Sequence, residues 1–455
     1  MPNHDVLIIG GGPGGYVAAI KAAQHDLNVG LVEKEAVGGV CLNWGCIPTK
    51  AMLKSAKAYL TVQHAKDYGV TVGDVSLDFE AVMKRKNNAV KKLTGGVKHL
   101  LKKNGVTVYN GEGTVKDANT VQVGDDTITT KNLILATGAR PAVPPIDGLK
   151  EGLEKGFVKT SKELLDIKEL PKRLVVIGGG VIGMEFATMF NAFGVEVTVV
   201  EREKDMLLGV DGEIRNAFLK KLQKDGVTLK TNADVTKVSS DRVTYKHDGQ
   251  ESSVKADMVL LSVGMRPNVE SFEALELEMD KAGVKTDEYM RTSVENVFAI
   301  GDLNGKYQLA HVASKEGLVA IDTILGHDHA MDYKAVPSGI YTFPEIAQVG
   351  LTEEEAKAQN IDYKSATFPL AANGKAIAEG ETDGLVKMIA EKKYGEVIGV
   401  HILAPTATDM ISEAVLGMNV ETTVDEYARA IHPHPTLSET LHETALGILH
   451  KPIHI

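Results

Sequence analysis

Two cysteines are the residues of this chain best suited to chemistry. Cys41 and Cys46 are the first and sixth residues of the segment 41–50, which reads Cys-Leu-Asn-Trp-Gly-Cys-Ile-Pro-Thr-Lys. Residues five apart in a regular α-helix have Cα atoms ~8.6 Å apart, whereas a disulfide requires them within ~7 Å. A bond between these thiols therefore needs an irregular backbone, which Gly45 and Pro48 permit.

Pro48 also bears on the reactivity of the second thiol. A proline in the first turn of a helix would leave Cys46 near the helix N-terminus, where the dipole lowers a thiol pKa. The alternative is two unrelated core residues, although a close pair in a reducing compartment is more often catalytic. A metal site is a poorer interpretation, because two further ligands are needed and none lies nearby. The pair predicts a redox-active centre.

Two glycine-rich turns predict two phosphate-binding sites. The first follows the apolar residues 6–9 and contains Gly10, Gly12 and Gly15, and the second follows residues 174–177 and contains Gly178, Gly180 and Gly183. Each has the G-x-G-x-x-G spacing between a strand and a helix that holds a pyrophosphate at the helix N-terminus. A lone match would be weak, but here the strand and helix patterns surround both copies.

Each turn is followed 23 residues later by an acid that ends a second apolar strand. These acids are Glu33 and Glu201, and an acid at this place accepts hydrogen bonds from a ribose hydroxyl and repels a 2′-phosphate. The alternative is a solvated carboxylate at a strand end. The second site is expected to prefer NAD over NADP, although Arg202 directly after Glu201 weakens that preference.

The two glycine-rich units repeat the same pattern, and this duplication indicates how the domains that position these residues are organised. Residues 133–141 and 258–267 form a further matching pair, and residues 297–302 return to strand character after the second unit. We therefore expect an α/β fold in which one dinucleotide-binding domain is inserted in the other. The expected segments are 1–145 (first domain), 146–268 (second domain), 269–335 (return to the first domain) and 336–455 (an α+β domain with a helix at 404–416).

The composition excludes several classes of protein. The 455 residues suggest about three domains, and 50 basic against 61 acidic residues give a net charge of −11, which opposes binding to nucleic acid. No apolar run reaches the ~18 residues of a membrane helix, and we see no signal peptide. The expectation is a cytoplasmic protein with no membrane association.

A second cluster with catalytic residue types lies near the C-terminus. His432 and His434 alternate with prolines, and Thr436 and Glu439 fit a capping box at the start of a helix. The capping role is the simpler interpretation. The functional one makes His434 a general base whose ring is oriented by Glu439.

These motifs together resemble the pyridine nucleotide-disulfide oxidoreductase family over essentially the whole chain. The resemblance rests on Gly10 to Gly15 with Glu33, the cysteine segment, Ala136-Thr137-Gly138, Gly178 to Gly183 with Glu185 and Glu201, Phe298 to Asp302, and His432 to Glu439. It implies two Rossmann-like domains, for FAD and NAD, and a C-terminal dimerisation domain. The implied FAD residues are Gly10, Gly12, Gly15, Glu33, Lys50, Gly113, Gly138, Asp302 and Ala310. The implied NAD residues are Gly178, Gly180, Ile182, Gly183, Glu185, Glu201 and Gly264.

The resemblance also implies catalytic roles. Lys50 would pair with Glu185 near the flavin, with a solvated lysine as the alternative, and Cys41 and Cys46 would form the redox disulfide. It selects His434 over His432 as the base, places it in the site of the partner subunit of a homodimer, and makes Glu439 its carboxylate.

The activity implied is oxidation of dihydrolipoamide to lipoamide with reduction of NAD⁺. The substrate dithiol would be free, or carried on a lipoyl-lysine of an acyltransferase or carrier protein in a 2-oxoacid dehydrogenase or glycine-cleavage complex. The alternatives are a glutathione-type disulfide reductase that uses NAD(P)H and a non-catalytic docking subunit of an acyltransferase complex.

Overall fold

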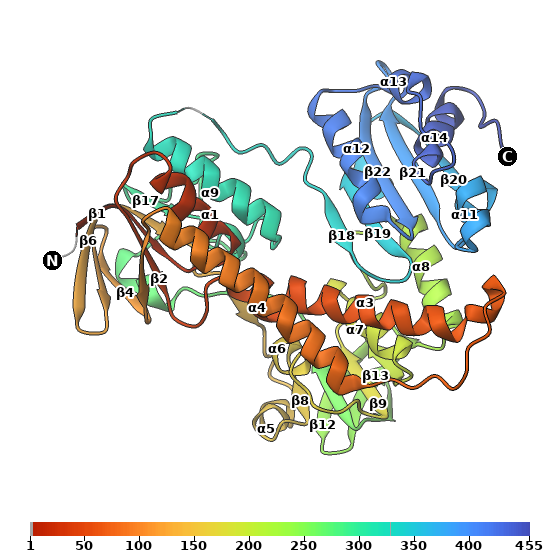
Figure 1. The fold of residues 1–455 in the computed structure, drawn as a ribbon, viewed down its shortest axis with the longest axis horizontal. Coiled ribbons are helices and arrows are strands. Elements are labelled where there is room, and N and C mark those ends of the chain that lie inside the picture. The colour runs from red at the N-terminus through yellow and green to blue at the C-terminus, as the bar shows by residue number, and fades with distance from the viewer. Residues whose placement is uncertain (1–2, 328) are drawn as a thin grey trace.

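The computed structural model describes residues 3–327 and 329–455, which form five β-sheets and their covering helices (Figure 1). In Figure 1 the first domain lies at the left, the second at the bottom, and the C-terminal domain at the upper right. Among the described residues, no helix has the length and apolar character needed to cross a membrane.

The first sheet has the order β3-β2-β1-β6-β5-β4, and β17 pairs with β6. The central strand β1 has fully buried Val6, Leu7 and Ile8 and pairs in parallel with β2 and β6, as expected for a sheet covered on both faces. Its strands are β1 (Asn3–Ile9), β2 (Val29–Glu33), β3 (Thr107–Asn110), β4 (Gly113–Asp117), β5 (Thr120–Val123), β6 (Asp126–Leu135) and β17 (Val297–Ala299).

The helices of this domain come from both ends of its sequence. α1 and α9 pack against each other, and the long α4 packs against α2 and α3. They are α1 (Pro13–Ala23), α2 (Gly39–Trp44), α3 (Cys46–Gln63), α4 (Phe79–Lys103) and α9 (Ala310–Ile324), with the 3-10 turns η1 (Ala65–Tyr68), η2 (Glu270–Leu275) and η3 (Gly301–Leu303).

The second domain repeats the parallel core and is inserted in the first. Its sheet has the order β11-β10-β9-β15-β8, with a separate three-stranded sheet β12-β13-β14. The strands are β8 (Val158–Lys159), β9 (Arg173–Ile177), β10 (Glu196–Val200), β11 (Thr228–Lys230), β12 (Ala233–Ser239), β13 (Arg242–His247), β14 (Gln250–Lys255) and β15 (Met258–Leu261). The helices are α5 (Leu149–Glu154), α6 (Ser161–Leu164), α7 (Val181–Ala192) and α8 (Gly212–Lys224).

The two matching segments after the parallel strands pair with each other. β7 (Ala139–Pro141) and β16 (Met265–Pro267) form a two-stranded antiparallel sheet, so the chain leaves the first domain and returns to it side by side. The pairing of β17 with β6 then completes the first sheet. This topology confirms the expected insertion of one dinucleotide domain in the other.

The C-terminal domain has an antiparallel sheet of order β18-β19-β22-β21-β20. Its strands are β18 (Ser338–Ile340), β19 (Glu345–Gly350), β20 (Tyr363–Pro369), β21 (Leu385–Glu391) and β22 (Val397–Ala404). Its helices are α10 (Glu353–Ala358), α11 (Gly374–Glu379), α12 (Ala407–Asn419), α13 (Val424–Arg429) and α14 (Glu439–Leu449), with the 3-10 turn η4 (Leu370–Ala372).

The helix predicted at 404–416 begins three residues later in the structure, at Ala407. Ala404 is fully buried and is the last residue of β22, where it pairs with Glu345 of β19. The apolar residues around Ala404 belong to the end of a buried strand. A short apolar run of this kind cannot be assigned to a strand or to a helix from its sequence alone.

Candidate active site

The two cysteines lie on either side of a break between two helices. α2 ends at Trp44, α3 begins at Cys46, and Gly45 between them has non-helical φ and ψ of −138° and −114°. A Cβ atom on Gly45 would lie 2.8 Å from the carbonyl oxygen of Val40, so the close approach at this break requires glycine. The irregular backbone that a bond between the cysteines needs is therefore present.

Both thiols are free and joined by a hydrogen bond between their side chains. The donated hydrogen bond and burial raise the pKa of Cys41, which keeps it protonated. The hydrogen bond from Cys41, helped by the positive charge of Lys50, lowers the pKa of Cys46 to about 7. Near neutral pH, Cys46 is therefore able to ionise beside a protonated Cys41, at a helix N-terminus that favours the thiolate.

Lys50, one turn further along α3, joins the cysteine pair to the other two domains. Its Nζ lies 2.9 and 3.0 Å from the two carboxylate oxygens of Glu185, which is nearly buried in α7. The Tyr341 ring of the C-terminal domain lies 4.3 Å from the same Nζ, and the Tyr341 backbone N–H donates to Glu185 at 2.9 Å. The predicted Lys50–Glu185 pair is therefore present in the structure. The alternative interpretation of Lys50, a side chain surrounded by solvent, does not apply.

The three glycines of the first turn have different roles in the structure. A Cβ on Gly10 would lie 2.1 Å from the carbonyl oxygen of Ala136, and one on Gly15 would lie 1.8 Å from that of Gly10. At Gly12 the nearest atom would be 3.9 Å away. The outer glycines therefore allow backbone to pack on backbone, whereas the middle one leaves open space at the N-terminus of α1, which fits a bound pyrophosphate.

The second turn repeats this arrangement. A Cβ on Gly178 would lie 2.4 Å from the Ser262 carbonyl oxygen, and one on Gly183 would lie 2.1 Å from that of Gly178. Among the described residues, no atom other than those of its neighbours in the chain lies within 4 Å of a Cβ on Gly180. The open space at the N-terminus of α7 fits a second dinucleotide.

The acids that follow the turns each bind back to their own glycine loop. Glu33 Oε2 accepts a hydrogen bond from the Gly11 N–H at 2.7 Å, and Glu201 Oε2 accepts one from the Gly179 N–H at 2.6 Å. Both carboxylates thus lie directly beside the turn, where a ribose would be. Arg202 points instead to Glu203, with nitrogen–oxygen distances of 3.0 and 3.2 Å.

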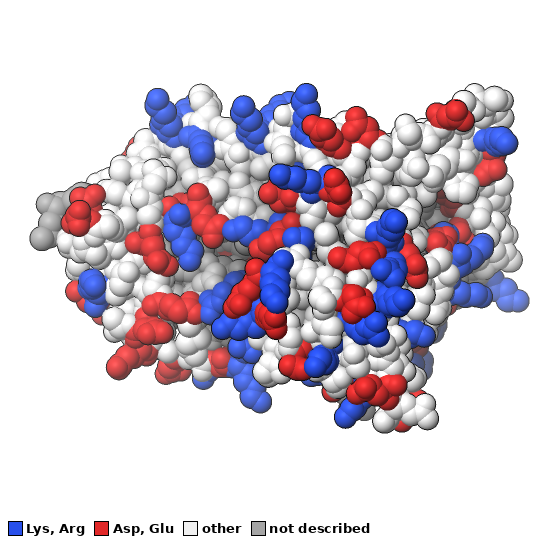
Figure 2. All heavy atoms as spheres, turned by 90° about the horizontal axis from the view of Figure 1, so that it is seen from below, with Lys and Arg blue, Asp and Glu red and all other residues white. Residues whose placement is uncertain are grey.

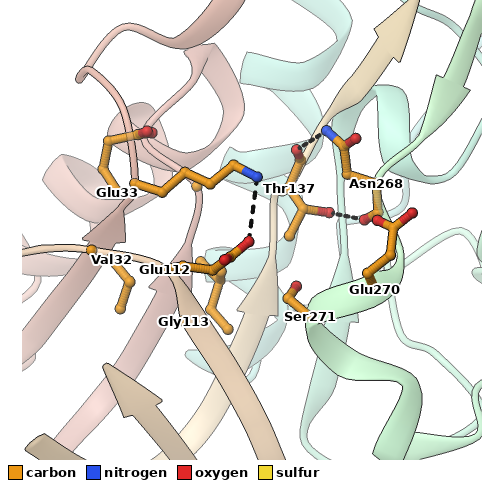
Figure 3. A pocket seen from close by; sticks show the side chains of 12 residues that line it. Val32, Glu33, Glu112, Gly113, Thr137, Asn268, Glu270 and Ser271 are labelled. Carbon is orange, nitrogen blue, oxygen red and sulfur yellow. Dashed lines mark hydrogen bonds and ion pairs between the residues drawn. The ribbon is translucent and has the colours of Figure 1, made fainter. Parts of the chain in front are cut away.

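We call the first glycine turn with Glu33 the first cradle, and the second turn with Glu201 the second cradle. A pocket at the carboxyl ends of β1 and β2 extends the first cradle (Figure 3). Gly10, Glu33 and Gly113 line it, and a Cβ on Gly113 would lie 3.1 Å from Val32. On the other side Thr137 and Asn268 exchange two hydrogen bonds of 2.6 and 2.9 Å. Ligands of open parallel sheets bind outside such strand ends.

Asp302 and Ala310 lie where the chain returns to the first sheet. Asp302 is in the turn directly after β17, and burial together with the nearby Glu316 raises its pKa to about 6. Glu316 of α9 is fully buried and accepts the Gly301 N–H at 2.6 Å. Ala310 is the first residue of α9, as predicted.

The remaining predicted cofactor residues lie at the edges of the two cradles. Gly138 and Gly264 have φ of +69° and +109°, a conformation that favours glycine, and occupy the matching turns before β7 and β16. Ile182 is a half-buried residue in the first turn of α7, next to Gly183.

Glu439 satisfies both roles that the sequence left open. One of its oxygens lies 2.9 Å from Nδ1 of His434, and the other accepts the Thr436 N–H at 2.8 Å. The capping box is only half formed, because α14 begins at Glu439 itself and the Thr436 hydroxyl donates to the Pro433 carbonyl oxygen. A carboxylate on Nδ1 leaves the Nε2 nitrogen of an exposed imidazole available for proton transfer.

His432 forms a different and more enclosed pair. Its Nε2 lies 2.9 Å from Glu413, and its side chain is 8% exposed against 79% for His434. The hydrogen bond to Glu413 raises the pKa of His432. This burial suits a structural contact better than proton exchange with a substrate.

Tyr341 is the site residue that sequence reasoning missed. It lies 156 residues after Glu185 and 291 after Lys50, in the C-terminal domain, and its motif carries no spacing signal that relates it to either. Only the packing of the three domains brings it to the ion pair.

Family models match most of the chain. Residues 4–317 match the pyridine nucleotide-disulphide oxidoreductase model, and residues 336–445 match the dimerisation domain of the same name. The chain belongs to the pyridine nucleotide-disulphide oxidoreductase family.

Curated members of this family are similar over nearly the whole chain. The dihydrolipoyl dehydrogenase of Geobacillus stearothermophilus is 43% identical, covering 99% of this chain and 97% of its own. One from Bacillus subtilis is 44% identical with the same coverage. One from Acholeplasma laidlawii is 54% identical, covering 73% of this chain and 99% of its own.

Solved structures of the family share the fold. The HOCl-induced flavoprotein disulfide reductase RclA from Escherichia coli is 28% identical, with a TM-score of 0.87 over 97% of this chain and 99% of its own. The arrangement of two dinucleotide domains and a dimerisation domain is therefore that of flavoprotein disulfide reductases.

Proposed function

We propose that this member of the family is an enzyme that oxidises dihydrolipoamide to lipoamide and reduces NAD⁺ to NADH. The observation that carries the proposal is the hydrogen-bonded Cys41–Cys46 pair at the N-terminus of α3, with the Cys46 pKa lowered to about 7. A dithiol substrate can exchange with such a pair. The similarity to curated dihydrolipoyl dehydrogenases supports this substrate.

The residues act in thiol–disulfide exchange. His434 takes a proton from one substrate thiol, and the resulting thiolate attacks Cys41 Sγ of the oxidised pair, which breaks the Cys41–Cys46 bond and leaves Cys46 as a thiolate. The second substrate thiol, after losing its proton, attacks the substrate sulfur of the mixed disulfide and displaces Cys41. The substrate leaves as a cyclic disulfide, and its two electrons remain in the reduced cysteine pair.

The glycine turns would hold the two cofactors of the reaction. Gly10, Gly12 and Gly15 with Glu33 would hold FAD, and Gly178, Gly180 and Gly183 with Glu201 would hold NAD. Bound FAD supplies a two-electron acceptor for the reduced cysteine pair and a hydride donor for NAD⁺. Lys50 keeps a positive charge beside Cys46, and Glu185 and Tyr341 fix its position.

The second cradle favours NAD over NADP. The Glu201 carboxylate lies beside the Gly179 N–H, where it repels a 2′-phosphate, and Arg202 is engaged by Glu203. The arginine therefore does not offset the repulsion by Glu201.

The base would come from a second subunit. The C-terminal segment 336–445 matches a dimerisation domain, and the exposed His434 of one chain would complete the cysteine site of the other in a homodimer. We infer the domain limits 1–145, 146–268, 269–335 and 336–455 for FAD-binding, NAD-binding, return and dimerisation segments. The dithiol would reach the enzyme free or on a lipoyl-lysine of an acyltransferase or carrier protein in a 2-oxoacid dehydrogenase or glycine-cleavage complex.

The test measures NADH formation from dihydrolipoamide and NAD⁺, next to NADPH oxidation by glutathione disulfide. We expect fast NADH formation that is absent in Cys41→Ser, and a fall in kcat/KM of roughly 10²–10³-fold in His434→Gln. His432→Gln is the control and is expected to retain most of the activity. Activity only with NADPH and glutathione disulfide would overturn the proposed substrate and nucleotide, and silence in both assays would favour a docking subunit.

Hybrid dimers test the origin of the base. In a dimer of one Cys41→Ser and one His434→Gln chain, a base supplied by the partner leaves one complete site and about half of the wild-type activity. A base supplied within the chain leaves no complete site. Residual activity no higher than that of His434→Gln alone would overturn the shared site.

A further inference from the structure

The long helix α4 carries a positive charge that contrasts with the rest of the chain. Over Phe79–Lys103 it has eight basic residues and one acid, Glu80, for a net charge of +7. The whole chain has a net charge of −11, so the remaining residues carry −18. On the face seen in Figure 2, by contrast, basic and acidic side chains are interspersed.

The charge is concentrated on the outer side of the helix. We call this side the basic face of α4; its members are exposed, and no ion pair is found for them among the described residues: Lys84, Lys91, Lys92, Lys98, Lys102 and Lys103. Lys84, Lys91 and Lys98 follow at seven-residue intervals, which places them ~10.5 Å apart along one side of a helix. The other two basic residues are different: Arg85 donates to the Ala51 carbonyl oxygen at 2.6 Å, and Lys86 is buried and donates to the Leu165 carbonyl oxygen.

The apolar side of α4 is packed in the core of the protein and is not available to a partner. Val82, Met83, Val97 and Leu101 are buried, and the helix packs against α2 and α3. These two helices carry Cys41 and Cys46, so α4 lies beside the elements that hold the redox pair (Figure 1). Its basic face is on the side of the helix opposite the buried residues. A partner that approaches this surface meets charge rather than an apolar groove.

We propose that the basic face of α4 receives a small acidic protein domain that carries the dithiol substrate. The proposal rests on the proposed function and names the surface that its macromolecular substrate uses. Charge complementarity between such patches steers encounter and raises association rates by 10–10³-fold. The short reach of the electrostatic interaction, about 8 Å at physiological ionic strength, confines the effect to the neighbourhood of the helix.

The charge balance favours a small domain over larger polyanions. A membrane or a nucleic acid extends beyond the ~37 Å of a 25-residue helix and would meet the net −18 of the remaining chain. The apolar side chains that a membrane-bound helix would insert are packed in the core. A compact acidic domain can contact the basic face without this repulsion.

The experiment compares two triple variants of the full-length holoenzyme with the same change in charge. Lys91→Gln/Lys92→Gln/Lys98→Gln neutralises the centre of the basic face. The control Lys220→Gln/Lys246→Gln/Lys281→Gln removes three exposed lysines elsewhere. The substrates are free dihydrolipoamide, an acidic lipoylated carrier domain in its reduced form, and the same domain with its surface carboxylates changed to amides.

At low ionic strength we expect the α4 variant to lose about 10-fold in kcat/KM with the acidic domain. Its kcat/KM with free dihydrolipoamide and with the amide-substituted domain should equal the wild-type value, and added salt should remove the difference. The control variant should match the wild type throughout. No loss in the α4 variant, or an equal loss in the control, overturns the proposal.

Binding measurements separate this proposal from the proposed function. If wild-type enzyme makes no NADH from free dihydrolipoamide, the proposed function fails, and binding of the fluorescently labelled acidic domain still tests the surface. Loss of that binding in the α4 variant alone supports an acidic-domain site. Stronger α4-dependent binding to phosphatidylserine vesicles or duplex DNA would overturn the choice of partner.

Discussion

Lys50 on α3 donates hydrogen bonds to both carboxylate oxygens of Glu185 on α7, at 2.9 and 3.0 Å. The two residues are 135 positions apart and belong to different dinucleotide domains. Their charges act in opposite directions on Cys46, because Lys50 lowers its pKa and Glu185 raises it. The pair therefore both joins the domains and balances the charge next to the thiolate.

This balance predicts opposite shifts for the two neutralising variants. Lys50→Gln removes the positive charge and should raise the pH at which Cys46 ionises above its value near 7, whereas Glu185→Gln should lower it. The ultraviolet absorbance of the thiolate, titrated in reduced protein without cofactors, measures both. Shifts in the same direction would contradict the charge model and point to a change in packing.

The hydrogen bond from Cys41 predicts a distinction between two small substitutions. Cys41→Ser keeps a donor beside Cys46, so its thiolate should still form near pH 7. Cys41→Ala removes the donor, which is the largest cause of the lowered pKa, and the midpoint should rise. Below the midpoint Cys46 is protonated and the thiolate is lost. Equal midpoints in both variants would show that Lys50 and the helix N-terminus suffice.

The shared carboxylate of Glu439 predicts separable losses of activity and stability. Glu439→Gln retains an oxygen for the Thr436 N–H but loses the charge that stabilises a protonated His434. We expect kcat/KM with dihydrolipoamide to fall about 10-fold, with a small change in Tm. Glu439→Ala also leaves the Thr436 N–H unpaired and should lower Tm further. A full loss of folding in Glu439→Gln would mean that the charge serves the helix rather than the base.

The middle and last glycines of the second turn, Gly180 and Gly183, predict contrasting effects of the same substitution. In the described part of the chain, a Cβ at Gly180 has no atom of a non-neighbouring residue within 4 Å, so Gly180→Ala should fold normally and lose affinity for NAD⁺. Alanine at Gly183 would place Cβ 2.1 Å from the Gly178 carbonyl oxygen, so Gly183→Ala should lower Tm and soluble yield. Calorimetric titration with NADH and thermal unfolding separate the two. Undiminished NADH affinity in Gly180→Ala would show that the pyrophosphate does not approach this glycine.

Two glycines in the middle of α4 predict an increase in stability. Gly95 and Gly96 lie in the helix, and within residues 3–327 and 329–455 a Cβ at either would meet no atom outside the neighbouring helix backbone within 4 Å. Each substitution by alanine should stabilise the helix by about 0.5–1 kcal/mol, because glycine loses more backbone entropy on folding. Thermal unfolding measures the gain. A lower Tm would indicate that the helix bends at this point in the native dimer.

The two dinucleotide folds and the cysteine site follow from local sequence patterns. Gly15 and Gly183 are required by contacts with the carbonyl oxygens of Gly10 and Gly178, within a single strand–turn–helix unit, so the spacing alone carries the information. The same holds for Cys46, which begins α3 because Gly45 and Pro48 are local determinants of the helix start. Signals confined to a short stretch of chain can be read without knowing the fold.

The contacts between the three domains depend on long-range packing that no local pattern predicts. Tyr341 reaches the Lys50–Glu185 pair only because the C-terminal domain packs on both dinucleotide domains. The helix α12 begins later than predicted because Ala404 pairs with Glu345 in a buried strand. This contact joins segments that are far apart in the sequence. Such contacts depend on the whole fold, since the same apolar residues satisfy a helix or a strand until their partners are known.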